Sequence, residues 1–167
     1  MSHVDVAWPK DKAELYNLLK LQAVSLAEAT PLPLPALANC AALLWDALEE
    51  INWAGFYLLK GETLVLGPFQ GKTACTLIPV GRGVCGTAAQ TRAIQLVPDV
   101  HAFPGHIACD SASNSEIVLP MIKDGVLMGV LDIDSPIFSR FDAKDAAGLQ
   151  AIVEGLLACT DWAGGLL

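Results

Sequence analysis

The sequence predicts a single α+β domain, with a central antiparallel sheet, helices on one face of it and a ligand pocket under loops on the other. Its 167 residues match the length of one domain. Helical periodicity comes first, then short strands interrupted by one short helix, then a closing helix. We therefore expect N-terminal helices over about 12–50, sheet and pocket over about 52–136, and a C-terminal helix over about 142–159.

Two helices are predicted ahead of the first strand. Apolar residues recur at helical spacing from Leu15 to Leu26 behind Asp11, whose carboxylate suits an N-cap position, so the first helix is expected over about 12–28. Three prolines then interrupt the pattern, and Pro35 fits the first turn of a second helix. Cys40 lies on the apolar face of that helix, where we expect it to be a core residue.

Alternation of side chains predicts the first two strands. Residues 52–59 form the first strand, and a period of two places Trp53 and Tyr57 on the same face. A short turn leads into the partner strand, which is expected over 63–68.

A glycine-rich stretch, GRGVCG at 81–86, lies between two further short strands expected at 77–79 and 93–97. It matches neither the phosphate-binding loop nor the dinucleotide fingerprint, because it has no Lys-Ser/Thr pair and no long helix after it. We interpret it as a tight turn at the start of a short helix that ends near Gln90.

A loop, a hairpin and a helix complete the chain. Residues 101–114 are rich in Gly, Pro and small polar residues, which is typical of a loop. The clearest hairpin joins 115–122 to 126–134 through Lys-Asp-Gly, and Asp142 is placed to cap the last helix.

The composition argues against several classes of partner. There are 18 acidic and 10 basic residues, for a net charge of −8, and no cluster of Lys and Arg, so we expect no binding to nucleic acid or to an anionic membrane. No apolar run reaches the roughly 18 residues of a membrane span. The N-terminal stretch lacks the apolar region of a secretory signal, so a cytoplasmic location is expected.

Five cysteines, an odd number, favour reduced thiols over a structural disulfide framework. Cys159, like Cys40, continues an apolar helical face and is interpreted as packing. Cys109 is different, because it lies in a polar loop, whereas unpaired cysteines are usually buried. From that loop alone, an incidental surface thiol is the simpler interpretation.

Two carboxylates, Asp132 and Asp134, share a face of the last strand because they are two residues apart. Glu116 joins them only in one register of the hairpin. A two-residue turn would place Glu116 opposite Ile133, whereas a three-residue turn with a bulge would place it opposite Asp132. Three acids on this mostly apolar face would repel one another, so we expect a site whose guest is an ammonium group.

Four segments of the chain resemble the free methionine-(R)-sulfoxide reductases, single-domain enzymes on the GAF fold: NWAGFYLL, GPFQGKTACTLIPVGRGVCGTAAQ, VPDVHAFPGHIACDSASNSEIVLP and GVLDIDSP. The resemblance covers about 52–136, and the flanking helices fit the same architecture. It implies reduction of free L-methionine-(R)-sulfoxide, protection against oxidative damage, and thioredoxin as the reductant. No metal or organic cofactor is implied, and the oligomeric state stays open, a homodimer included.

The same resemblance assigns the redox residues. Cys109 is implied as the thiol that attacks the sulfoxide and becomes a sulfenic acid. Cys75 is implied as the resolving thiol that forms a disulfide with it, and Cys85 is the alternative resolver. The loop that carries Cys109 is expected to act as a catalytic lid.

The resemblance also implies roles for the residues that strand alternation places on one face of the sheet. Trp53 and Tyr57 would enclose the methyl sulfoxide end of the substrate. Glu116, Asp132 and Asp134 would hold its polar end, with Glu116 as the proton donor because its acidic neighbours keep it protonated.

Two other functions are compatible with parts of the sequence. A GAF module that senses a small ligand such as a cyclic nucleotide is permitted by the fold, but the acidic face would repel phosphate. A zinc site would use residues from the set Cys75, Cys85, Cys109, His101 and His106. Their spacing lacks the close cysteine pair of structural zinc sites, and histidines in loops more often anchor the loop by hydrogen bonds.

Overall fold

Six strands form one antiparallel sheet in the order β3-β2-β1-β6-β5-β4 in the computed structural model, which describes residues 7–107 and 109–167. The strands are β1 (Trp53–Lys60), β2 (Thr63–Gly71), β3 (Leu77–Pro79), β4 (Gln95–Val97), β5 (Ser115–Lys123) and β6 (Val126–Ser135). The helices are α1 (Lys12–Ala29), α2 (Pro33–Ala47), α3 (Gly83–Thr91) and α4 (Ala143–Cys159), with one 3₁₀ turn, η1 (Val100–Ala102). The predicted α+β class and the order of its elements are confirmed.

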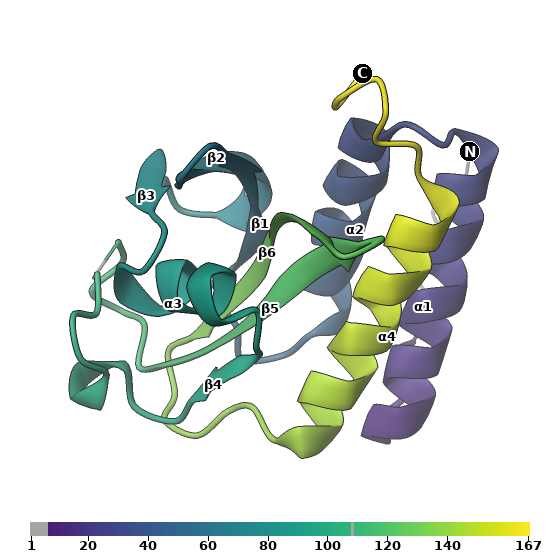
Figure 1. Cartoon of the computed structure of the whole chain (residues 1–167). Helices are drawn as coiled ribbons and strands as arrows, with labels where there is room; N and C mark the ends of the chain where they lie inside the picture. Colours follow the sequence, from purple (N-terminus) through teal and green to yellow (C-terminus); the bar gives the residue numbers. More distant parts are fainter. Residues whose placement is uncertain (1–6, 108) are drawn as a thin grey trace.

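The three longest helices cover one face of the sheet (Figure 1). α2 and α4 pack on the strands, and α1 packs on α2 and α4. The short helix α3 lies on the opposite face, with the loops, so the expectation that the helices share one face holds only for the long ones. α3 is held there because Val84 and Ala88 are buried against Val118 and Val130 of the sheet. In the described part of the chain, no helix is long and apolar enough to cross a membrane.

Both faces of the sheet are buried, and alternation assigns each side chain of β5 to one of them. Ile117, Leu119 and Met121 point into the core beneath the long helices. Val118 belongs to the second core, under α3. Glu116, which alternates with Ile117, is therefore directed to the face that α3 and the loops cover.

The hairpin β5–β6 has a register that neither predicted alternative gave. The turn has two residues, Asp124 and Gly125, with φ of 50° and 77°, as a type I′ turn requires. A bulge farther along, at Met128, then shifts the pairing by one residue, so that Glu116 lies opposite Asp134 and not opposite Asp132. A shift of one residue moves Glu116 to the face that carries Asp132 and Asp134. All three acids therefore lie on one face of the sheet, as the predicted site requires.

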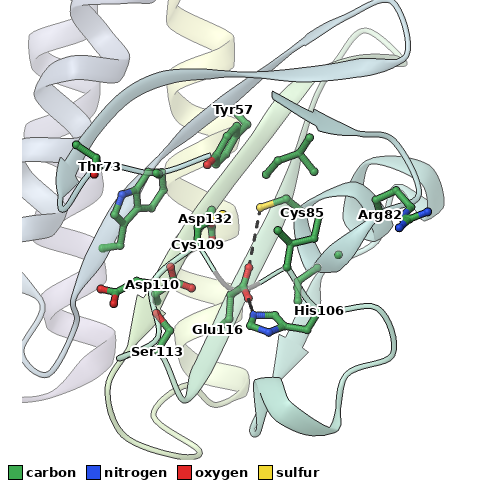
Figure 2. Close-up of a pocket in the computed structure, with 17 residues that line it drawn as sticks. Tyr57, Thr73, Arg82, Cys85, His106, Cys109, Asp110, Ser113, Glu116 and Asp132 are labelled. Atoms are coloured by element: carbon green, nitrogen blue, oxygen red, sulfur yellow. Dashed lines mark hydrogen bonds and ion pairs between the residues drawn. The ribbon is translucent and has the colours of Figure 1, made fainter. Parts of the chain in front are cut away.

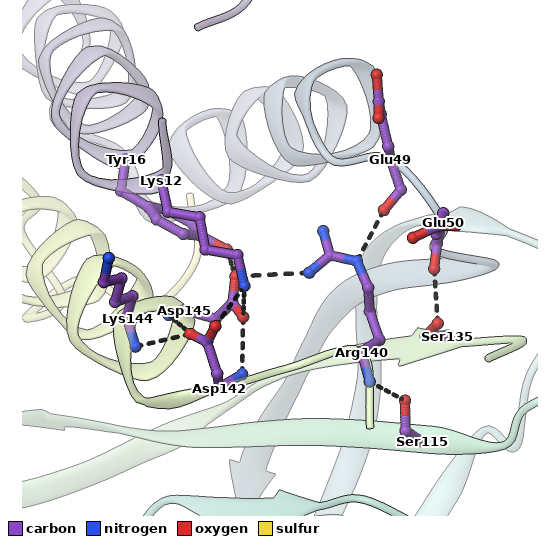
Figure 3. A network of polar contacts seen from close by, with 10 residues as sticks. All are labelled: Lys12, Tyr16, Glu49, Glu50, Ser115, Ser135, Arg140, Asp142, Lys144 and Asp145. Atoms are coloured by element: carbon purple, nitrogen blue, oxygen red, sulfur yellow. Dashed lines mark hydrogen bonds and ion pairs between the residues drawn. The ribbon is translucent and has the colours of Figure 1, made fainter. Parts of the chain in front are cut away.

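A buried carboxylate ties the ends of α1 and α4 together (Figure 3). Asp145, which is 1% exposed, accepts hydrogen bonds from the Tyr16 hydroxyl at 2.8 Å and from Lys12 Nζ at 2.6 Å. Arg140 Nη1 lies 3.5 Å from Asp145 Oδ1, the oxygen that also accepts from Tyr16. Asp145 also completes a capping box with Asp142, whose carboxylate accepts from the first backbone N–H groups of α4.

The same network reaches the start of β5. The Arg140 guanidinium donates to the carbonyl of Glu49 at 3.0 Å, and the backbone N–H of Arg140 donates to Ser115 Oγ at 3.3 Å. Ser115 in turn donates to the carbonyl of Ile137. The residue that precedes Glu116 is thus fixed to the helical layer.

We expect Asp145→Ala to lower the free energy of unfolding by about 3 kcal/mol, because it leaves the buried Tyr16 hydroxyl without a partner and breaks two ion pairs. Asp142→Ala is the matched control. Its side chain is exposed and serves mainly as the helix cap, so it should cost only about 1 kcal/mol. Urea denaturation of both variants measures the difference, and equal losses would show that the buried carboxylate has no special role.

Candidate active site

A small cavity lies on the face of the sheet opposite the long helices, between β1, β5, β6, α3 and the loop that carries Cys109 (Figure 2). Its volume is about 40 Å³. That is room for a few water molecules, whereas pockets that hold small organic ligands usually measure about 300–1,000 Å³.

An aromatic wall closes one side of the cavity. Trp53 stacks on Phe69 with ring centroids 5.2 Å apart and on Tyr57 at 5.8 Å. Trp53 Nε1 donates to the carbonyl of Lys72 at 3.1 Å, and the Tyr57 hydroxyl donates to the carbonyl of Cys75 at 2.9 Å. The two aromatic residues therefore also hold the segment that carries Cys75 against the sheet.

Three carboxyl groups line the floor of the cavity. Glu116 is 5% exposed and Asp132 is 6% exposed, while Asp134 is half-buried. Gly55 pairs with Asp132 and Trp53 with Asp134 across β1 and β6, which sets the acids beside the aromatic wall. The predicted pocket residues are therefore brought together by three adjacent strands.

Burial raises the pKa of all three acids, and mutual repulsion adds to this effect at Glu116 and Asp134. Burial, with the charges of Asp132 and Asp134, raises the pKa of Glu116 well above its usual range. Burial, the charge of Asp132 and that of Asp110 raise the pKa of Asp134 in the same way. The pKa of Asp132 rises least, to about 6, because hydrogen bonds from Cys85 and Glu116 oppose the effect of burial. Asp132 is therefore the first to ionise, and Glu116 retains its proton at neutral pH.

Glu116 lies between Cys85 and His106 (Figure 2). Its two carboxyl oxygens are 4.0 Å from Cys85 Sγ and 3.8 Å from His106 Nε2. Burial, together with the nearby acids, raises the pKa of the Cys85 thiol well above its usual value. Burial lowers the pKa of His106, with a smaller contribution from His101. At neutral pH both neighbours of Glu116 are thus uncharged.

A disulfide joins Cys75 to Cys109 across the mouth of the cavity, with 5.8 Å between the two Cα atoms. Cys75 is half-buried and Cys109 is exposed. Cys85 carries a free thiol inside the cavity, and Cys40 and Cys159 lie in or against the core under the long helices, as predicted for packing residues.

A clamp that the sequence analysis missed holds the loop on which Cys109 lies. Asn52 Nδ2 donates to Asp110 Oδ2 and to Ser113 Oγ, both at 3.1 Å. Asp110 also accepts from the backbone N–H of Ala112 at 2.9 Å, a turn contact that a residue pattern can suggest. The contact with Asn52 had no signal in the sequence, because 58 residues separate the partners.

The candidate zinc ligands considered from the sequence do not come together in one site. The disulfide occupies Cys75 and Cys109, and His101 Nε2 lies 3.0 Å from Asn114 Oδ1, where it anchors the loop. Within residues 7–107 and 109–167, the one group of three or more ligand-type side chains close enough for a metal ion is a different set: Cys85, Glu116 and Asp132.

Comparisons with known proteins agree with this architecture. The GAF domain family matches residues 13–156. The free methionine-R-sulfoxide reductase of Escherichia coli K12 is 54% identical over 155 residues, which cover 91% of this chain and 94% of that protein. The structure of the fRMsr of Staphylococcus aureus in complex with substrate is 53% identical, with a TM-score of 0.83, and covers 87% of this chain and 95% of that one. The free methionine-R-sulfoxide reductase from Neisseria meningitidis, also in complex with its substrate, has a TM-score of 0.89 at 43% identity over 95% of each chain.

The raised pKa of Asp132 makes stability depend on pH. Between its ordinary pKa of 3.8 and about 6, the folded protein binds more protons at this group than the unfolded chain does, so stability falls as the pH rises through this window. We expect Asp132→Asn to remove roughly 3 kcal/mol of that fall, as a two-unit shift implies.

Urea denaturation of the disulfide-bonded protein between about pH 4 and 7 tests this expectation. Asp142→Asn is the control, because its lysine partner lowers the pKa of Asp142 to about 2 and its contribution is lost only below pH 3.8. Parallel pH profiles for wild type and Asp132→Asn would contradict a raised pKa at Asp132.

Proposed function

This chain belongs to the free methionine-R-sulfoxide reductase family of GAF-domain proteins, and we propose that it reduces free L-methionine-(R)-sulfoxide to L-methionine with its own thiols. The observation that carries the proposal is the Cys75–Cys109 disulfide at the mouth of the acidic and aromatic cavity. Oxidation of two thiols to a disulfide releases the two electrons that a sulfoxide accepts. Both thiols belong to one chain, so the redox step needs no thiol from a second copy.

The polar floor and the aromatic wall suit the two ends of this substrate. We propose that the methyl sulfoxide end lies against Trp53 and Tyr57, and that the ammonium group lies among Glu116, Asp132 and Asp134. Asp132 Oδ1 supports this placement, because it is buried without a hydrogen-bond partner among the described residues. A methionine sulfoxide within a peptide has no ammonium group and would leave these acids unpaired.

The chemical step begins when the Cys109 thiolate attacks the sulfoxide sulfur. Glu116 protonates the sulfoxide oxygen, a role that its raised pKa supports because it keeps the proton at neutral pH. The oxygen is transferred to Cys109, methionine leaves, and Cys109 becomes a sulfenic acid.

The second step restores a disulfide. The Cys75 thiolate attacks Cys109 Sγ, the sulfenic oxygen leaves as water, and the disulfide forms. Cys75 is preferred to Cys85 as the resolving thiol because it is already paired with Cys109 and because the raised pKa of the buried Cys85 disfavours its thiolate. A cytosolic dithiol such as thioredoxin then reaches the exposed Cys109 sulfur and regenerates both thiols.

The small cavity supports the assignment of the disulfide form to the end of this cycle. A volume of about 40 Å³ does not accommodate methionine sulfoxide, so the Cys109 loop must move away before the next substrate binds. Reduction of the disulfide breaks the covalent link that holds the loop to Cys75. The Asn52 clamp and the exposed Lys72–Asp110 ion pair still attach the loop near Cys109.

We expect wild-type protein to support oxidation of NADPH in an assay with thioredoxin, its reductase and free L-methionine-(R)-sulfoxide. Cys109→Ser should lower the rate by at least about a thousandfold, because the attacking group is gone. Cys159→Ser, which changes a cysteine outside the cavity, is the matched control and should keep the wild-type rate.

N-acetyl-methionine sulfoxide tests the role of the ammonium group in the same assay and should be a poor substrate. A wild-type protein that binds the free sulfoxide without turnover would favour the sensing module instead. Full activity of Cys109→Ser would contradict the proposed chemistry.

Cys75→Ser and Cys85→Ser separate the two candidates for the resolving thiol. Cys75→Ser should release one methionine per chain and then stop, with Cys109 left as a sulfenic acid that dimedone labels and mass spectrometry locates. Cys85→Ser should continue past the first turnover with thioredoxin. The reverse pattern would assign resolution to Cys85.

A further inference from the structure

Three buried side chains from three different elements converge beneath the redox disulfide. Cys85 comes from α3, Glu116 from β5 and Asp132 from β6, and one ligand atom of each lies within 4.8 Å of the others. Cys85 Sγ and Glu116 Oε1 are 4.0 Å apart. The group combines one soft sulfur donor with two hard oxygen donors, all of them inside the cavity.

The cluster also points to a positively charged guest. Asp132 Oδ1 is buried and, among the described residues, has no hydrogen-bond partner. His106 Nε2 lies 3.8 Å from Glu116, but burial lowers the pKa of His106 and disfavours its positive charge. Lys72 pairs with Asp110, outside the cluster, and its side chain is 76% exposed. A buried carboxylate oxygen without a donor is costly unless a ligand supplies the missing positive charge.

We propose that Cys85, Glu116 and Asp132 form a binding site for a divalent metal ion of intermediate softness, best matched by Zn²⁺, and that the bound ion prevents the substrate from binding. The blocking part of this inference rests on the proposed function, because the ion would occupy the position assigned to the substrate ammonium. The binding part stands on the geometry alone.

Zinc fits the donors and the spacing. In a tetrahedral site, bonds of about 2.3 Å to sulfur and about 2.0 Å to oxygen place the two ligand atoms about 3.5 Å apart. The observed separations are 4.0 Å between Cys85 Sγ and Glu116 Oε1 and at most 4.8 Å within the group, so side-chain rotations must bring the ligand atoms closer by roughly 0.5–1.3 Å. Three protein ligands leave a fourth position for a water molecule, for which the cavity of about 40 Å³ has room.

The chemistry of the donors selects against the abundant hard cations. Mg²⁺ and Ca²⁺ prefer oxygen ligands in larger numbers, six or about that, whereas a thiolate selects Zn²⁺ and related ions. Zn²⁺ binds to the deprotonated forms of Cys85, Glu116 and Asp132, and no electron is transferred. The affinity for Zn²⁺ should therefore increase with pH.

The disulfide form isolates this site from the other thiols of the pocket. Cys75 and Cys109 are bonded to each other and cannot act as thiolate ligands, while Cys40 and Cys159 lie in the helical layer. In the oxidised protein, Cys85 is therefore the cysteine of the cavity that can bind a metal ion as a thiolate.

The test is a titration of tag-free, full-length, disulfide-bonded protein with Zn²⁺ by calorimetry, and with Co²⁺ by absorbance. Wild type should bind one Zn²⁺ per chain, and Co²⁺ should give the ultraviolet charge-transfer band of a thiolate ligand. Cys85→Ser should abolish that band and weaken Zn²⁺ binding by more than about a hundredfold, beyond the effect typical of an outer-shell change. Cys159→Ser should change neither.

Asp132→Asn gives an independent readout. In wild type, Zn²⁺ should raise the thermal unfolding midpoint, as any ligand of the folded state does, and Asp132→Asn should lose most of that increase. If Cys85→Ser binds Zn²⁺ as tightly as wild type, or if wild type shows no saturable binding, the metal site is wrong.

Competition with the substrate links the two proposals without making one depend on the other. Zn²⁺ should raise the KM for free methionine sulfoxide in wild type and much less in Cys85→Ser, provided that turnover is observed at all. A protein that binds Zn²⁺ through Cys85 but never turns over would contradict the proposed function and leave the metal site intact.

Discussion

The burial of three carboxyl groups on one sheet face is the constraint on which the rest of the pocket depends. Glu116, Asp132 and Asp134 sit on adjacent strands, and two of them are almost completely removed from solvent. Charged acids in such a place repel one another and lose their hydration, so protons or a cation must compensate. The site is therefore arranged to retain protons or to accept a positively charged ligand. Both properties follow from the free-energy cost of burying charged acids next to one another.

Packing on the helical side of the molecule offsets the free-energy cost of burying these acids. The opposite face of the same strands is packed against α2 and α4 through apolar side chains such as Ile117 and Leu131. The Asp145 network fixes the beginning of α4 and, through Arg140, the beginning of β5. A rigid layer behind the sheet can thus hold a destabilising polar face in front of it, as functional sites commonly require.

The loop on the pocket side has the opposite character. Near Cys109 it is attached to the domain by the disulfide, by hydrogen bonds from the amide of Asn52 and by the exposed Lys72–Asp110 ion pair. Redox chemistry and local motion can release these attachments. The disulfide closes across the mouth of a cavity of about 40 Å³. The loop over the acidic floor is therefore covalently attached to the segment that carries Cys75.

The sequence by itself determined the features that depend on neighbours along the chain. Asp11 and Asp142 cap their helices, the Lys-Asp-Gly segment connects the hairpin, and alternation places Trp53 beside Tyr57, because each of these features depends on residues close together in the chain. The motifs also identified the family before any contact was known. The tertiary structure alone decided which groups meet.

A bulge at Met128 set the partner of Glu116, since turn chemistry fixes the register at the turn and not beyond an irregularity farther along the strands. Packing of α3 on the sheet brought Cys85 to Glu116, and the Asn52–Asp110 contact spans 58 residues. Such contacts join segments that have no local relationship, so only the assembled fold can specify them.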